Sequence, residues 1–270
     1  MLKRIITGAF VTAFSFLILC FSGIPVVLRC AAAVLGIFAM SEILHAAKAE
    51  EEKVLSALAG TVAVLLPFCP VNGYNRLMLI LFQAAVIVFA LLMVFQGRVK
   101  IDRPAKIVCL VAVVLLLIRA LPEFSTMENG TYYLGAALTL SFVADIAAFL
   151  IGRAAGKHKL APKISPNKTL EGSLAGLVFS VVTILVVGVN MEYAGLVRID
   201  YTRLTVYAVL TAVISEFGDL AMSTVKRICG VKDFGSLLPG HGGILDRFDS
   251  FLFAAAWTLW FCTVTGGFFI

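Results

Sequence analysis

The sequence predicts an all-α integral membrane protein, built as a polytopic bundle of about nine transmembrane helices. Hydrophobic residues make up 61% of the 270 residues, charged residues make up 14%, and the mean hydropathy is +1.02. Soluble domains carry about 25% charged residues. Apolar runs of span length follow one another and leave no block long enough for a soluble domain. We therefore expect a single integral membrane domain over residues 1–270.

Each apolar run is interpreted as one membrane helix. The first run follows a basic start but has no small-x-small cleavage site before a polar region, so we expect a membrane helix rather than a cleaved signal peptide. The third run is short for a span. The expected spans lie near residues 5–22, 25–45, 54–70, 77–96, 105–122, 132–151, 172–190, 204–224 and 250–269.

Lysine and arginine residues indicate how the spans are oriented. With the N-terminus in the cytoplasm, seventeen of the 22 lie on the cytoplasmic side, in agreement with the positive-inside rule. This orientation places two polar loops, 152–171 and 225–249, on the cytoplasmic face of the cell (inner) membrane, where we expect the active site. The net charge of +6 does not indicate nucleic-acid binding, because no basic helix or aromatic-lined groove accompanies it.

The eighth span carries a polar stripe. Glu216, Asp219, Ser223 and Lys226 follow one another at offsets of three, four and three residues, so they share one face of a helix. Carboxylates and a lysine near a membrane boundary are costly unless they face a polar cavity or an ion. The stripe therefore predicts a functional site on this helix.

A glycine-rich loop, PGHGG, follows the stripe and cannot form a regular element. It ends at Asp246, Arg247 and Asp249, and the two acids share a face if a helix begins there. Carboxylates bind Mg²⁺, cations neutralise phosphate oxygens, and glycine backbone can approach a phosphate closely. The pattern favours phosphate chemistry over an ordinary cytoplasmic loop whose basic residues only fix topology.

The same stretch resembles the signature of the phosphatidate cytidylyltransferases, also called CDP-diacylglycerol synthases. The resemblance implies a polytopic membrane enzyme that joins CTP to phosphatidic acid from the lipid bilayer, releases pyrophosphate, uses Mg²⁺ and serves phospholipid biosynthesis. It is also compatible with a homodimer. The matching positions are Ser223, Lys226, Arg227, Lys232, Asp233, Gly235, Leu238, Pro239, His241, Gly242, Gly243, Asp246, Arg247 and Asp249.

The loop at 152–171 has the prolines, lysines and SPNKT sequence of an irregular connection, and Thr169 can cap the helix that begins near Glu171. Its ISPNKTLEG segment resembles the ISP-x-K-T-x-E-G block of the same family. Asn167 stands where that block usually has a second lysine. Matching positions are Ile164, Ser165, Pro166, Lys168, Thr169, Glu171 and Gly172.

Asp145 lies deep in the sixth span, where a carboxylate is expected to face protein or a water-filled cavity. It could pair with a lysine or contribute to the substrate site. Its resemblance to the family's D-x-x-A-aromatic pattern, with Phe149 as the aromatic residue, favours the substrate site. Glu42 and His45, near the end of the second span, are interpreted as an interfacial pair without chemistry.

The expected cytidylyl transfer assigns a role to each site residue, and Asp219 and Asp246 each lie at a helix end that flanks the glycine-rich loop. Asp219 and Asp246 are the expected Mg²⁺ ligands, and His241 is expected to donate to phosphate. The expected catalytic residues are Asp219, Asp246, Lys226, Arg227 and Arg247. The expected substrate-binding residues are Ser223, Lys232, His241, Asp249, Ser165, Lys168, Glu171 and Asp145.

Three other function classes would leave different patterns in the sequence. A CTP-dependent kinase of polyprenol or phytol would use similar groups but attack the γ-phosphorus, and the signature through Asp249 argues against it. A CDP-alcohol phosphotransferase would carry D-G-x-x-A-R before G-x-x-x-D-x-x-x-D, which this sequence lacks. A transporter would not need PGHGG and would be favoured by internal repeats. No internal repeat is evident in the sequence.

Overall fold

The computed structural model describes residues 2–48, 53–69, 82–84, 86–88, 103–238 and 242–270. It divides into two compact units. The first comprises Met1–Thr131 and Thr224–Asp249, and the second comprises Tyr132–Ser223 and Ser250–Ile270. The span expected at 77–96 lies largely outside the described residues.

The described elements confirm the all-α fold. The α-helices are α1 Leu2–Cys20, α2 Pro25–Ala46, α3 Lys53–Leu65, α5 Arg103–Arg119, α6 Gly130–Ala155, α7 Leu170–Tyr193, α8 Tyr201–Cys229 and α9 Leu245–Thr265. Two 3₁₀ helices, η1 Leu66–Phe68 and η2 Leu121–Thr126, and two strands, β1 Lys159–Ala161 and β2 Ser165–Thr169, complete the described elements.

Within the described residues, six helical segments are long and apolar enough to cross a membrane. They contain 20 to 29 residues, whereas a typical hydrocarbon core needs about 20. The chain is therefore a multi-pass membrane protein, and the count of nine spans stays a prediction. The six segments are Pro25–Ala46, Ile107–Thr126, Gly130–Ala155, Leu170–Tyr193, Tyr201–Cys229 and Leu245–Thr265.

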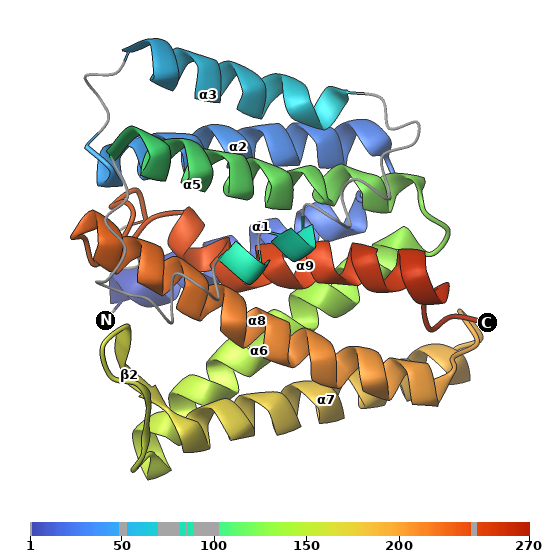
Figure 1. The fold of residues 1–270 in the computed structure, drawn as a ribbon. Coiled ribbons are helices and arrows are strands. Elements are labelled where there is room, and N and C mark those ends of the chain that lie inside the picture. The colour runs from blue at the N-terminus through green and yellow to red at the C-terminus, as the bar shows by residue number, and fades with distance from the viewer. Residues whose placement is uncertain (1, 49–52, 70–81, 85, 89–102, 239–241) are drawn as a thin grey trace. The chain divides into compact units, whose positions relative to one another are not determined.

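In the first unit, α2 packs against both α3 and α5 (Figure 1). Pro25 occupies the first turn of α2, where its missing N–H removes no helical hydrogen bond. At the end of α5, Arg119 donates to Glu123 in η2 and to the carbonyl oxygen of Cys69, 3.2 Å away. Both charged side chains are buried. This ion pair belongs to the core of the unit.

In the second unit, glycines let α6 and α7 approach at backbone distance. A Cβ on Gly172 would lie 2.6 Å from the carbonyl oxygen of Ala148, and one on Gly176 would lie 2.7 Å from that of Ala144. Small residues at such spacing permit close helix packing in membranes. This packing fixes the start of α7, which follows directly from β2.

The sequence predicts an irregular connection between α6 and α7. The structure instead contains a β-hairpin there. Strand β1 pairs antiparallel with β2, and Lys159 lies opposite Thr169. Pro166 is tolerated because every strand of a two-stranded sheet is an edge strand, so its missing N–H need not break the ladder. The hairpin places Lys168 and Thr169 at the N-terminus of α7.

Thr169 caps α7, as the sequence predicts. Its hydroxyl oxygen accepts a hydrogen bond from the backbone N–H of Gly172, 3.2 Å away, and its backbone is extended. We expect Thr169→Ala to lower the free energy of unfolding by about 1 kcal/mol, because that N–H loses its acceptor. Thermal unfolding in detergent would measure the change. Thr169→Ser keeps the hydroxyl and serves as the control; equal losses in both variants would contradict the capping role.

Helices α8 and α9 both extend beyond the expected spans. Helix α8 continues to Cys229, where Gly230, with φ +74°, ends it. Helix α9 begins at Leu245 rather than near residue 250. The expected start of α9 was placed where the apolar run begins. The helix starts earlier because acidic residues such as Asp246 are favourable in the first turn. Asp246 and Asp249 therefore both lie on α9, as their spacing suggested, and the connecting loop shortens to 230–244.

Candidate active site

Lys226, in the last turn of α8, forms an ion-pair cluster with Asp246 and Asp249 of α9, here called the Lys226 cluster. Its Nζ lies 2.9 Å from Asp246 Oδ1 and 3.7 Å from Asp249 Oδ2. The side chains of Lys226, Asp246 and Asp249 are only 10%, 3% and 7% exposed. All three belong to the first unit. Spacing alone linked Asp246 to Asp249, and the structure adds Lys226 of α8 to this pair.

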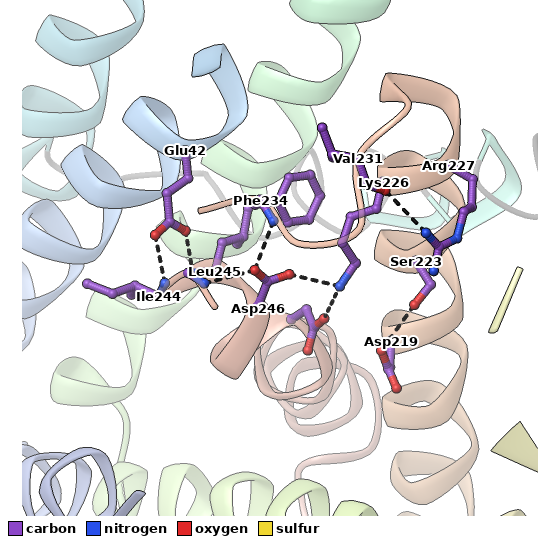
Figure 2. A network of polar contacts seen from close by, with 12 residues as sticks. Glu42, Asp219, Ser223, Lys226, Arg227, Val231, Phe234, Ile244, Leu245 and Asp246 are labelled. Atoms are coloured by element: carbon purple, nitrogen blue, oxygen red, sulfur yellow. Dashed lines mark hydrogen bonds and ion pairs between the residues drawn. The ribbon is translucent and has the colours of Figure 1, made fainter. Parts of the chain in front are cut away.

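Asp246 also holds the glycine-rich loop. Its Oδ2 accepts a hydrogen bond from the backbone N–H of Phe234 at 2.9 Å (Figure 2). It also accepts one from the backbone N–H of Gly243 at 2.9 Å. Gly242 has φ +87°, and a Cβ there would lie 3.1 Å from Asp246 Oδ2. One oxygen of Asp246 thus anchors the loop backbone, and the other faces the ammonium group of Lys226.

Glu42 of α2 is part of the same unit and was missed as a site residue. Its Oε1 accepts from the N–H of Ile244 at 2.7 Å, and its Oε2 accepts from the N–H of Leu245 at 2.9 Å (Figure 2). Glu42 is 6% exposed. A buried carboxylate in an apolar helix was the available signal, because such a group needs a specific partner.

Lys168 forms the second cluster, here called the Lys168 cluster, with Glu216 and Asp219 of α8. Its Nζ lies 2.7 Å from Glu216 Oε1 and 2.6 Å from Asp219 Oδ2. The hydroxyl of Ser223 donates to Asp219 Oδ1 at 3.5 Å. The acids of the predicted stripe therefore share one lysine from the hairpin.

The electrostatics of this second cluster keep Lys168 charged. Burial acts to lower the pKa of Lys168, but the carboxylates of Asp219 and Glu216 outweigh it and hold the pKa above the ordinary lysine value. The ammonium group is therefore present throughout the neutral pH range.

Asp145 and Glu171 have partners within the second unit. Ser250 donates its hydroxyl hydrogen to Asp145 Oδ2 at 2.8 Å. Glu171 accepts from the backbone N–H groups of Lys157 and His158 at 3.1 and 3.2 Å, and lies 2.6 Å from Nδ1 of His158. Glu171 thus joins the base of the hairpin to α7. The substrate-binding roles of Asp145 and Glu171 stay predictions.

The remaining expected cations lie at the surface. Arg227, Lys232 and Arg247 are exposed, and Arg227 donates to the carbonyl oxygen of Val231 at 3.3 Å. Ser165 begins β2 and is half-buried. His241 lies outside the described residues. These exposed cations lie in or beside the loop 230–244, where they are suited to contact an anionic ligand that arrives from water.

The donor atoms of both clusters suit Mg²⁺. Within the described part of the chain, no group of three or more His, Cys, Asp or Glu side chains could by itself hold a metal ion. The clusters instead offer carboxylate and hydroxyl oxygens, with Asp219 beside Ser223 and Asp246 beside Asp249. Mg²⁺ in phosphate-transfer sites uses one or two carboxylates, and the substrate phosphates and water complete its coordination. The residues therefore fit a metal that is bound together with its substrate.

Comparison with known proteins identifies the family. The model of the cytidylyltransferase family matches residues 2–265. The phosphatidate cytidylyltransferase of Staphylococcus saprophyticus is 40% identical over 145 residues, and that of Staphylococcus aureus strain COL is 41% identical over 145 residues. Each match covers 54% of this chain and 54% of the relative, so the chain spans about half the length of the curated relatives it matches. Because the family model matches nearly the whole sequence, the chain belongs to the cytidylyltransferase family.

Proposed function

We propose that the protein is a phosphatidate cytidylyltransferase. It transfers the cytidylyl group of CTP to phosphatidic acid, giving CDP-diacylglycerol and pyrophosphate for phospholipid biosynthesis. The observation that carries the proposal is the Lys226 cluster, in which the signature residues Lys226, Asp246 and Asp249 meet where the glycine-rich loop enters α9. The family membership and the names of the relatives support the same activity.

The reaction is a displacement at phosphorus. A phosphate oxygen of phosphatidic acid forms a bond to the α-phosphorus of CTP, the bond to the bridging oxygen breaks, and pyrophosphate leaves with the electron pair. The attacking phosphate monoester is already anionic at neutral pH, so no strong base is needed. Catalysis then consists of positioning and of neutralising charge as it develops.

The residues divide this work between them. Lys226, Arg227 and Arg247 neutralise the phosphate oxygens. Lys168 holds Asp219 in place through its ion pair. Phosphate and substrate contacts are assigned to Ser223, Lys232, His241, Asp249, Ser165, Lys168, Glu171 and Asp145.

Asp219 and Asp246 are the carboxylates that we assign to Mg²⁺. When bound, the metal supplies positive charge to the triphosphate. Asp246 is suited to this role because the N–H groups of Phe234 and Gly243 fix its orientation. Asp219 is held chiefly by Lys168, whose Nζ lies 2.6 Å from its Oδ2, and the Ser223 hydroxyl lies 3.5 Å from its Oδ1.

The enzyme acts at a membrane surface. We place the protein in the cell (inner) membrane as one integral domain, with loops 152–171 and 225–249 facing the cytoplasm. The distribution of lysine and arginine supports this orientation. CTP enters from the water, whereas phosphatidic acid, which has two acyl chains, arrives from the bilayer. A homodimer is consistent with the proposal.

Two labelled forms of CTP test the reaction. Purified protein in detergent is given phosphatidic acid, Mg²⁺ and CTP labelled on either the α or the γ phosphate. We expect α label in the lipid, γ label in released pyrophosphate, and loss of both when EDTA removes the metal. Label from the γ position in a polyprenol or other lipid acceptor would identify a kinase. Transfer from neither position would favour a transporter.

A further inference from the structure

Glu42 connects the start of the chain to the signature loop within the first unit. It is 202 residues from Ile244 in the sequence, yet both of its carboxylate oxygens accept backbone N–H groups there. These are the N–H groups immediately before and at the first residue of α9, which have no partner inside the helix. Glu42 therefore provides the acceptor oxygens for two N–H groups at the N-terminus of α9.

The loop is shaped to receive this carboxylate. A Cβ on Gly235 would lie 2.7 Å from Glu42 Oε1, and one on Gly243 would lie 2.4 Å from Glu42 Oε2. Neither position has room for a side chain while Glu42 occupies its place. The two glycines are thus explained by contact with Glu42, independently of the hydrogen bonds.

Glu42 and Asp246 together bind three successive N–H groups. The N–H of Gly243 donates to Asp246, and the next two, from Ile244 and Leu245, donate to Glu42. Asp246 follows Leu245 directly, so any shift of the Leu245 backbone also moves the Asp246 carboxylate. Glu42 therefore holds the residue directly before the carboxylate that faces Lys226.

We propose that Glu42 is a positioning residue for cytidylyl transfer, holding residues 243–245 so that Asp246 keeps its productive orientation. This inference rests on the proposed function. Glu42 acts through the backbone and has no contact with substrate in this role. A carboxylate is required because it offers two acceptor oxygens to two N–H donors, whereas an amide offers one acceptor and turns a donor against the other N–H.

Glu42→Gln tests the proposal directly. We expect kcat to fall by about 10- to 100-fold, as for other groups that orient a catalytic ligand, while KM for phosphatidic acid stays unchanged. The matched control is Glu123→Gln, which removes another buried carboxylate of the same unit. We expect that control to lower the thermal midpoint without lowering kcat.

A readout besides activity separates this inference from the proposed function. Hydrogen exchange of a peptide covering residues 242–248 should be faster in Glu42→Gln than in the wild type and unchanged in Glu123→Gln. If the wild type transfers no cytidylyl group, the proposed function fails. Exchange still reports whether Glu42 holds the loop.

Gly235→Ala provides a second test that does not alter Glu42. Its methyl group should displace the carboxylate, so kcat should fall in the wild-type background and change little in a Glu42→Ala background. If Glu42→Gln fails to fold, kcat and hydrogen exchange of Gly235→Ala in the wild-type background test the proposal alone, because that variant keeps the Glu42 carboxylate. Wild-type kcat and exchange in Glu42→Gln, or an equal effect of Gly235→Ala in both backgrounds, would overturn the proposal.

Discussion

Asp246→Asn is expected to lower kcat for cytidylyl transfer by about 10³-fold. Asp246 Oδ1 faces the Lys226 ammonium, and Oδ2 accepts two backbone N–H groups. An amide has one acceptor oxygen, so in either orientation its NH₂ group meets a donor. The substitution also removes the charge that we assign to Mg²⁺. Initial rates with α-labelled CTP, measured over a series of Mg²⁺ concentrations, would give the size of the loss.

The matched control for this variant is Asp200→Asn. Asp200 accepts the N–H of Arg203 at the start of α8, and asparagine caps a helix about as well as aspartate. We expect that variant to keep wild-type kcat. Should Asp246→Asn retain most of the activity at saturating Mg²⁺, the assignment of Asp246 as a metal ligand and catalytic residue would be wrong.

Lys168→Met is expected to destabilise the protein as well as slow the reaction. It leaves Glu216 and Asp219, one turn apart on α8, without the cation that lies 2.7 and 2.6 Å from them. Removing one partner of a fully buried ion pair costs about 3 to 5 kcal/mol. These side chains are 19 to 25% exposed, so we expect a smaller loss of about 1 to 3 kcal/mol. Thermal unfolding in detergent would measure it.

The pH dependence of this loss gives a sharper test. The pKa of Lys168 is raised in the folded protein, so its contribution to stability is complete below the unfolded lysine value of about 10.4 and is lost as the pH rises through the higher folded value. The difference in stability between wild type and Lys168→Met should therefore be constant from about pH 6 to 9 and shrink above about pH 10.4.

Two substitutions make this comparison specific. Lys168→Arg keeps the charge and should retain most of the stability. Lys163→Met removes an exposed lysine from the turn of the same hairpin and should change stability little. A difference that already declines between pH 6 and 9 would show that the ammonium of Lys168 is not what holds the two carboxylates.

Local spacing predicted the parts of the site that lie on single helices. The offsets from Glu216 to Lys226 place four polar groups on one face, and α8 is continuous across them. The spacing of Asp246 and Asp249 likewise indicated a shared helical start, which α9 confirms. These inferences succeed because helical periodicity depends only on neighbouring residues.

The partners between elements could not be predicted in the same way. Lys168 is 48 residues from Glu216, and Glu42 is 202 residues from Ile244. Such contacts depend on tertiary packing, and no local pattern in a single sequence shows which distant residues will meet. The hairpin was missed for a related reason, because prolines and lysines indicate a loop and its pairing depends on partner strands.

The composition of the two clusters bears on the order of binding. Each contains one lysine and two carboxylates, so the three side chains together carry one excess negative formal charge. At the carboxylates that charge attracts a divalent cation and repels a bare triphosphate, whereas the exposed Arg227, Lys232 and Arg247 attract both forms of the nucleotide. CTP should therefore bind more readily as its magnesium complex than as the free nucleotide. CTP in excess over Mg²⁺ should slow the reaction, because the free nucleotide binds the protein weakly and withdraws the metal from it.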